Sequence, residues 1–145
     1  MPNVNVNPIL QPVVVLLGWT LFMSVWVLVT RIPAMLAQNI ALDPNVPPKD
    51  LTRDLPAKVR WKADNYNHLM EAPTLFYAVA LVIGFSDPGN SAAVTTAWVY
   101  VLLRMLHSLV QALVNHIPTR LFLFVLSTIA LAVLMWHAAL AVIAK

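Results

Sequence analysis

Four long runs of apolar residues follow one another along the chain, separated by short segments that are rich in polar residues and proline. The runs occupy positions 12–30, 69–85, 92–114 and 121–144. None of them alternates apolar and polar residues with a period of two, which excludes the strands of a membrane β-barrel. A helix needs about 20 residues to cross the hydrocarbon core of a bilayer. The pattern therefore predicts four membrane-spanning helices.

The second run is shorter than a full span, but the residues before it also have helical character. Asp54 is a residue type that caps helices, and Pro56 suits a first helical turn. We therefore predict one long helix over 55–85. Pro73 should kink it, because proline cannot donate the backbone hydrogen bond to the carbonyl of Leu69.

The predicted organisation is a single four-span domain over residues 1–145, an all-α integral membrane bundle. Its four helices cover about 12–30, 55–85, 92–115 and 120–144. The connection 31–54 contains prolines at positions 44, 47 and 48, so we expect an extended loop there.

Composition supports the membrane assignment and excludes other classes of protein. Of the 145 residues, 60% are hydrophobic and only 10% are charged, whereas an ordinary soluble domain carries about 25% charged residues. A disordered chain would be far less apolar. The absence of cysteine excludes disulfide frameworks, thiolate zinc sites and cysteine nucleophiles.

The basic residues predict how the helices are oriented in the membrane. Residues 1–30 and 86–91 contain no Lys or Arg. Six basic residues follow the first helix, namely Arg31, Lys49, Arg53, Lys58, Arg60 and Lys62. Because basic residues favour the cytoplasmic side, loops 31–54 and 115–120 are predicted to be cytoplasmic and both termini non-cytoplasmic. The net charge of +3 then reflects topology, and no nucleic-acid partner is expected.

Two stripes of polar residues lie inside the predicted helices, where lipid makes polarity costly. The stripes are Arg104, His107, Ser108, Gln111 and Asn115 in the third helix, and Asp64, Asn67, His68 and Glu71 in the second. At about 1.5 Å of rise per residue, Glu71 and His107 lie roughly 12–13 Å deep and Arg104 roughly 18 Å deep. Glu71 is therefore predicted within reach of Arg104, since ionised groups at that depth need partners.

Two interpretations of the stripes are open. One is a structural clasp, in which a Glu71–Arg104 ion pair sets helix register or subunit contact. The other is a polar cavity that opens to the cytoplasm with Arg31 and Arg120 at its mouth. Such a cavity suits an anionic, peptide-like or phosphorylated ligand, together with an apolar ligand that enters from lipid. The spacing of potential ligands gives no support for a metal site.

Two motifs in the stripes resemble those of the MAPEG family, the membrane-associated proteins in eicosanoid and glutathione metabolism. The sequence RMLH at 104–107, followed by PTR at 118–120, is similar to the family's R-x-x-H…P-x-R run. The sequence NHLMEAPTLF at 67–76 resembles its N-x-x-E…P-x-x-F. Chain length and the number of predicted helices also resemble those of the family, so the resemblance covers nearly the whole chain.

This resemblance implies a homotrimer whose sites lie between protomers near the cytoplasmic side and hold glutathione. The residues that it implies for binding or supporting glutathione are Arg31, Asn67, His68, Glu71, Arg104, His107 and Gln111. Arg31 would reach the carboxylates. Arg120 matches the arginine that stabilises the glutathione thiolate and is the catalytic candidate, because an adjacent cation makes a thiol nucleophilic.

The resemblance favours glutathione-dependent transferase or peroxidase chemistry on a lipophilic electrophile, with membrane lipid as a further partner. The alternative is a non-catalytic lipid-binding or scaffold protein of the same fold. Gln111 and Asp64 favour this alternative, because the family's enzymes carry Tyr and Arg at these positions, whereas Arg120 favours the enzyme. A small transporter subunit has only the polar stripes in its favour.

Overall fold

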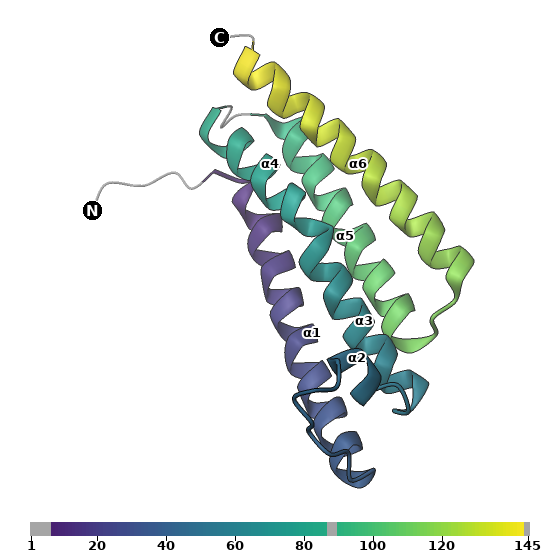
Figure 1. Ribbon diagram of the computed structural model, residues 1–145. Coiled ribbons are helices and arrows are strands. Elements are labelled where there is room, and N and C mark those ends of the chain that lie inside the picture. Colours follow the sequence, from purple (N-terminus) through teal and green to yellow (C-terminus); the bar gives the residue numbers. More distant parts are fainter. Residues whose placement is uncertain (1–6, 87–89, 144–145) are drawn as a thin grey trace.

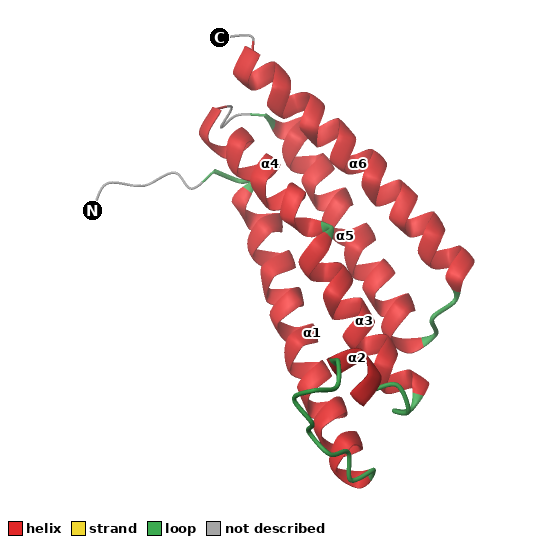
Figure 2. Cartoon of the chain, viewed as in Figure 1, coloured by secondary structure: helices red, strands yellow, loops and turns green. Residues whose placement is uncertain are grey.

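The computed structural model describes residues 7–86 and 90–143 of the 145-residue chain. In these residues all regular secondary structure is helical (Figure 2). The helices are α1 (Leu10–Ala37), α2 (Pro48–Leu51), α3 (Ala57–Glu71), α4 (Pro73–Ser86), α5 (Ser91–Leu113) and α6 (Ile117–Ile143).

Four helical segments in the described chain are long and apolar enough to cross a membrane, as the apolar runs predict. They are α1, α3 with α4, α5 and α6, of 28, 30, 23 and 27 residues. Large apolar side chains such as Leu21 and Phe122 are exposed on their outer faces, where lipid rather than water would cover them. Helix α1 is longer than predicted and reaches Ala37 instead of residue 30.

The second span is interrupted at Ala72 between α3 and α4, next to Pro73, where the sequence predicted a kink. Pro73 has no N–H to donate to the carbonyl of Leu69, while the N–H of Ala72 still donates to the carbonyl of His68 at 3.2 Å. The start of the span differs from the prediction. Helix α3 begins after Pro56 without a side-chain cap, so Asp54 does not cap it.

Asparagines in the left-handed region end two of the helices. Asn39 follows α1 with φ 50°, and Asn115 follows α5 with φ 55°, a conformation common just after a helix C-terminus. Asn115 therefore belongs to the turn and not to the helix predicted over 92–115. The turn leads into α6 at Ile117, ahead of the predicted start at residue 120.

Helix α5 occupies the centre of the bundle. It packs along α6 on one side and against α1 and α3 on the other, while α4 packs against α6 and α1. The start of α1 and the end of α6 lie at one end of the bundle (Figure 1). The α1–α3 connection and the α5–α6 turn lie at the opposite end, as the predicted topology requires.

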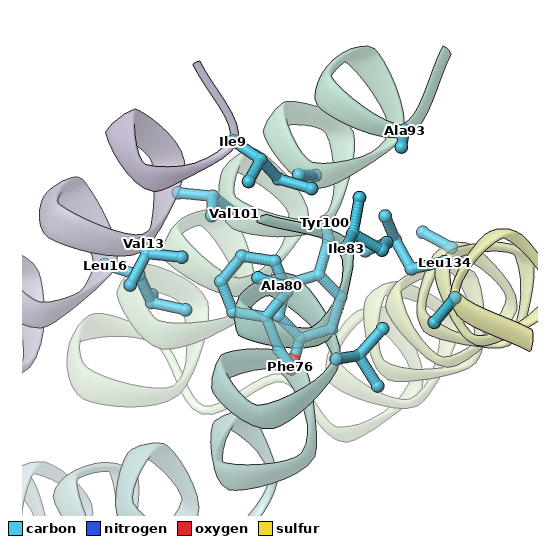
Figure 3. Packing of buried hydrophobic residues seen from close by; sticks show 14 of the residues in the cluster. Ile9, Val13, Leu16, Phe76, Ala80, Ile83, Ala93, Tyr100, Val101 and Leu134 are labelled. Carbon is cyan, nitrogen blue, oxygen red and sulfur yellow. The ribbon is translucent and has the colours of Figure 1, made fainter. Parts of the chain in front are cut away.

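The apolar core lies between α1, α4, α5 and α6 (Figure 3). The rings of Phe76 and Tyr100 stack at its centre, with centroids 4.5 Å apart and an interplanar angle of 18°. Fully buried alanines on α5, Ala93 and Ala97, leave room for the neighbouring helices to approach closely. The core holds this half of the bundle together, and the polar residues of α5 lie closer to the other end.

Candidate functional site

The polar stripe of α5 is buried. Arg104 is 1% exposed and His107 4% exposed, and Ser108 and Gln111 are buried beside them. These residues share one helical face because they are three, four and seven positions apart. The predicted stripe on the third span is therefore confirmed as an inward-facing polar surface.

Arg104 makes its contact with α3 through a backbone carbonyl. Its Nη2 donates to the carbonyl oxygen of His68 at 3.1 Å, and its guanidinium lies 6.0 Å from the ring centroid of Phe124. Its buried Nε has no hydrogen-bond partner among the described residues. The guanidinium thus binds α3 one turn before the break at Ala72 and retains an unused donor.

The predicted contact between Glu71 and Arg104 is wrong within one chain. Glu71 is exposed, and no ion pair joins the two side chains in the described structure. The prediction that Arg104 lies near the level of Glu71 along the bundle axis was close, because Arg104 reaches the carbonyl of His68, three residues before Glu71. The side chain of Glu71, however, lies on another face of α3. An intrachain clasp between these residues is therefore excluded as the source of helix register.

The inward face of the second span carries Asn65, Leu69 and Phe76, which are all buried. These positions are separated by four and seven residues, the spacing of one helical face. Asp64 and Asn67, which the sequence prediction placed in an inward stripe, are exposed instead. Extending the apolar spacing of Phe76 and Leu69 back by four residues would have identified Asn65.

Asn65 belongs to a polar contact between three helices. The Oγ of Ser108 accepts hydrogen bonds from Asn65 Nδ2 at 2.8 Å and from Trp19 Nε1 at 3.0 Å. The Oδ1 of Asn65 is buried without a partner in the described part of the chain. Because α1, α3 and α5 each contribute one group, this contact fixes their relative register.

A second polar contact connects α5 to the beginning of α6. His107 Nδ1 lies 3.0 Å from the carbonyl oxygen of Arg120, and its Nε2 lies 3.2 Å from Oε1 of Gln111. Since a carbonyl can only accept, Nδ1 carries the hydrogen, and Nε2 of the neutral ring is then the acceptor for an N–H of the Gln111 amide. Both ring nitrogens of His107 are therefore engaged inside the chain, and the histidine positions the backbone of Arg120.

The side chain of Arg120 is half-buried and held from one side. Its Nη1 donates to Oδ1 of Asn115 in the α5–α6 turn. Its buried Nε has no partner in the described chain. The left-handed conformation of Asn115 places this acceptor beside the start of α6, so the turn and the His107 contact together orient Arg120.

Arg120 lies at an open groove between α3, α5 and α6. The groove has a volume of about 360 Å³ and is lined by His68, His107, Ile117, Arg120, Leu121 and Phe124. Its walls are mainly apolar. The imidazole rings of His68 and His107 both line it, with centroids 6.3 Å apart and an interplanar angle of 40°. A cation and two imidazoles therefore border a space suited to an apolar molecule.

A cationic pocket lies between the last part of α1, α2 and α3. Its volume is about 520 Å³, and its lining residues are Arg31, Pro48, Lys49, Thr52, Arg53, Leu55, Val59, Arg60, Ala63, Asp64 and Asn67. The predicted site residues are thus divided. His68, His107 and Arg120 line the groove, whereas Arg31 and Asn67 line the pocket. The sequence predicted one polar cavity lined by both stripes and the basic first connection, with Arg31 and Arg120 at its mouth, whereas the structure places these two arginines in separate spaces.

Comparison with known proteins gives one match. The sequence model of the MAPEG family matches residues 9–140, which include most of all four spans. No curated protein and no solved structure matches the chain.

Proposed function

The chain belongs to the MAPEG family, and from this membership and the geometry of the groove we propose that it is a glutathione-dependent transferase or peroxidase acting on lipophilic electrophiles. It is an integral, multi-pass membrane protein with four apolar helices. We further propose a homotrimer in which loops 31–54 and 115–120 are cytoplasmic and both termini non-cytoplasmic. The active site would then lie between protomers and face the cytoplasm.

The observation that carries this proposal is the position of Arg120 at the edge of a mainly apolar groove. Arg120 forms no ion pair with an acid in the described residues, so its guanidinium can offset the charge of an anionic sulfur in the groove. A lipophilic molecule in the groove would lie beside that sulfur. Bound glutathione would supply the thiolate, which would form a carbon–sulfur bond as a leaving group departs. With a hydroperoxide, the O–O bond would break to give an alcohol and water while two glutathione thiols are oxidised to the disulfide.

The chain's own residues would orient the reactants. His107, which Gln111 holds in turn, contacts the backbone of Arg120, and Asn115 holds the side chain of Arg120. Arg104 does not line the groove, but it contacts the carbonyl of His68 and the ring of Phe124, two residues that do. A fixed cation stabilises developing negative charge without reorganisation at the moment of reaction, which is the role that we assign to Arg120.

The remaining candidate residues require contacts between protomers. Glu71 is exposed on α3, at a depth where a carboxylate needs a partner. Arg31 and Asn67 line the cationic pocket and not the groove. In the proposed trimer, Glu71, His68 and Asn67 would bind the peptide part of glutathione, and Arg31 would bind its carboxylates.

Titration of the detergent-solubilised protein with glutathione, followed by calorimetry, tests the proposal. Saturable binding at working cofactor concentrations is expected, and its absence would exclude the transferase and peroxidase assignments. Mass measurement in the same detergent should give three copies, and a monomer would remove the site between protomers. Because the chain has no cysteine, single cysteines placed in either loop can report sidedness with a membrane-impermeant reagent.

A non-catalytic lipid-binding or scaffold protein is the second candidate. The observation in its favour is that Gln111, at the position where the resemblance calls for a tyrosine, is committed to His107 and offers no hydroxyl to a sulfur. The groove is also mainly apolar. Binding of a lipophilic molecule without glutathione binding would establish this alternative.

A further inference from the structure

We propose that the cationic pocket binds the phosphate of an anionic phospholipid. Four cationic side chains from three different segments line this one cavity, namely Arg31, Lys49, Arg53 and Arg60. Asp64 is the only acid in its lining. Arg31 is also assigned to glutathione in the proposed function, whereas Lys49, Arg53 and Arg60 are not.

The four cations receive no compensation from the chain itself. In residues 7–86 and 90–143 none of their side chains forms an ion pair or a hydrogen bond with another residue. Lys49 lies in α2, and Arg53 lies two residues after its end. Both line the same pocket as Arg31 of α1 and Arg60 of α3. Cations that converge on a single cavity repel one another, and an anion in that cavity relieves the repulsion.

Phosphate matches the donors that this pocket offers. Guanidinium groups bind phosphate oxygens through two parallel hydrogen bonds, and lysine adds a compact positive charge. Three arginines and one lysine outnumber the single negative charge of Asp64. Leu55, Val59 and Ala63 provide apolar surface in the same lining, which the glycerol part of a phospholipid can cover.

The position of the pocket favours a lipid over a free phosphate. Arg31 lies inside α1, and the exposed apolar side chains of Ile32 and Leu36 follow it on the same helix. These residues help to line an apolar groove of about 430 Å³ at the same end of α1. Lys62 lies over the ring of Trp26 at 5.3 Å, a pairing that suits the membrane–water boundary. The pocket therefore opens where lipid headgroups lie.

The test compares two variants with equal loss of charge. Lys49→Ala/Arg53→Ala removes two cations from the pocket, whereas Lys58→Ala/Lys62→Ala removes two from the same end outside it. Binding of phosphatidylglycerol and of phosphatidylcholine to the detergent-solubilised protein is measured by native mass spectrometry. We expect preference for phosphatidylglycerol, with affinity roughly fivefold lower per cation removed and hence roughly 25-fold lower in the pocket variant.

Equal loss in the two variants, or no preference for phosphatidylglycerol, would overturn the proposal. Thermal stabilisation by inorganic phosphate that equals stabilisation by the lipid would also overturn it, in favour of a soluble phosphate ligand. Glutathione titration of the same variants separates this proposal from the catalytic one. Lipid preference without glutathione binding would support the lipid site alone, and intact glutathione binding in the pocket variant would show that the two sites are distinct.

Discussion

The apolar groove and the cationic pocket both take residues from α3, where the adjacent residues His68 and Asn67 line one each. In the groove, polar groups are held by the chain itself, as His107 is by Arg120 and Gln111. In the pocket, four cations have no partner in the described structure. The groove is thus oriented before any ligand binds, whereas the pocket depends on a molecule outside the chain.

Replacement of Arg120 should give the largest effect, because it removes the oriented cation of the groove. Arg120→Ala should lower kcat/KM for conjugation to a standard electrophile roughly 100-fold to 1,000-fold, the usual effect of losing one group that stabilises developing charge. Glutathione affinity should change little. Lys58→Ala, which removes a cation at the same end, is the control. An equal loss of affinity would make Arg120 a recognition residue instead.

Removal of the contact between Trp19, Asn65 and Ser108 should lower the stability of the protein without removing a charged group. Ser108→Ala leaves Trp19 Nε1 and Asn65 Nδ2 without their acceptor, so the free energy of unfolding should fall by about 2 kcal/mol. Thermal denaturation in detergent measures the change. Ser91→Ala, at the exposed start of α5, serves as the control. Equal melting temperatures for wild type and Ser108→Ala would contradict the role of this contact in register.

Loss of the Gln111 side chain should have a smaller effect. Gln111→Leu removes the partner of His107 Nε2, and the free energy of unfolding should fall by about 1 kcal/mol. Activity should fall less than in Arg120→Ala, since His107 still holds the backbone of Arg120. The exposed Gln11 provides a matched Gln→Leu control. Loss of activity as large as in Arg120→Ala would place Gln111 in direct contact with the reactants.

The smallest effect is expected in the cationic pocket. Arg53→Ala in lipid-free detergent should change the free energy of unfolding by less than about 0.5 kcal/mol, because an exposed side chain without hydrogen bonds contributes little. Chemical denaturation measures the free energy of unfolding of Arg53→Ala, with Ser108→Ala measured in the same way for comparison. A loss as large as that of Ser108→Ala would show that the pocket is held together by contacts within the chain.

The positions of site residues along the helix axes could be predicted from the sequence better than the directions of their side chains. The rise per residue placed Arg104 near the level of the second polar stripe, and Arg104 does contact His68. It did not show that Glu71 faces outward and Asn65 inward. Polar residues lie on every face of α3, so their spacing does not mark the inward face; the spacing of Leu69 and Phe76 does, and the packing of α3 against α1 and α5 shows it.

The sequence alone determines the four apolar spans, the interruption next to Pro73 and the polar face of α5, because each depends on local features of one helix. The groove and the cationic pocket depend on contacts between segments that are distant in the chain. Arg31 and Arg53 converge only because the loop and α2 bring Arg53 to a pocket that α1 and α3 also line. Periodicity describes one helix at a time, and a site shared by several helices is decided by how they pack.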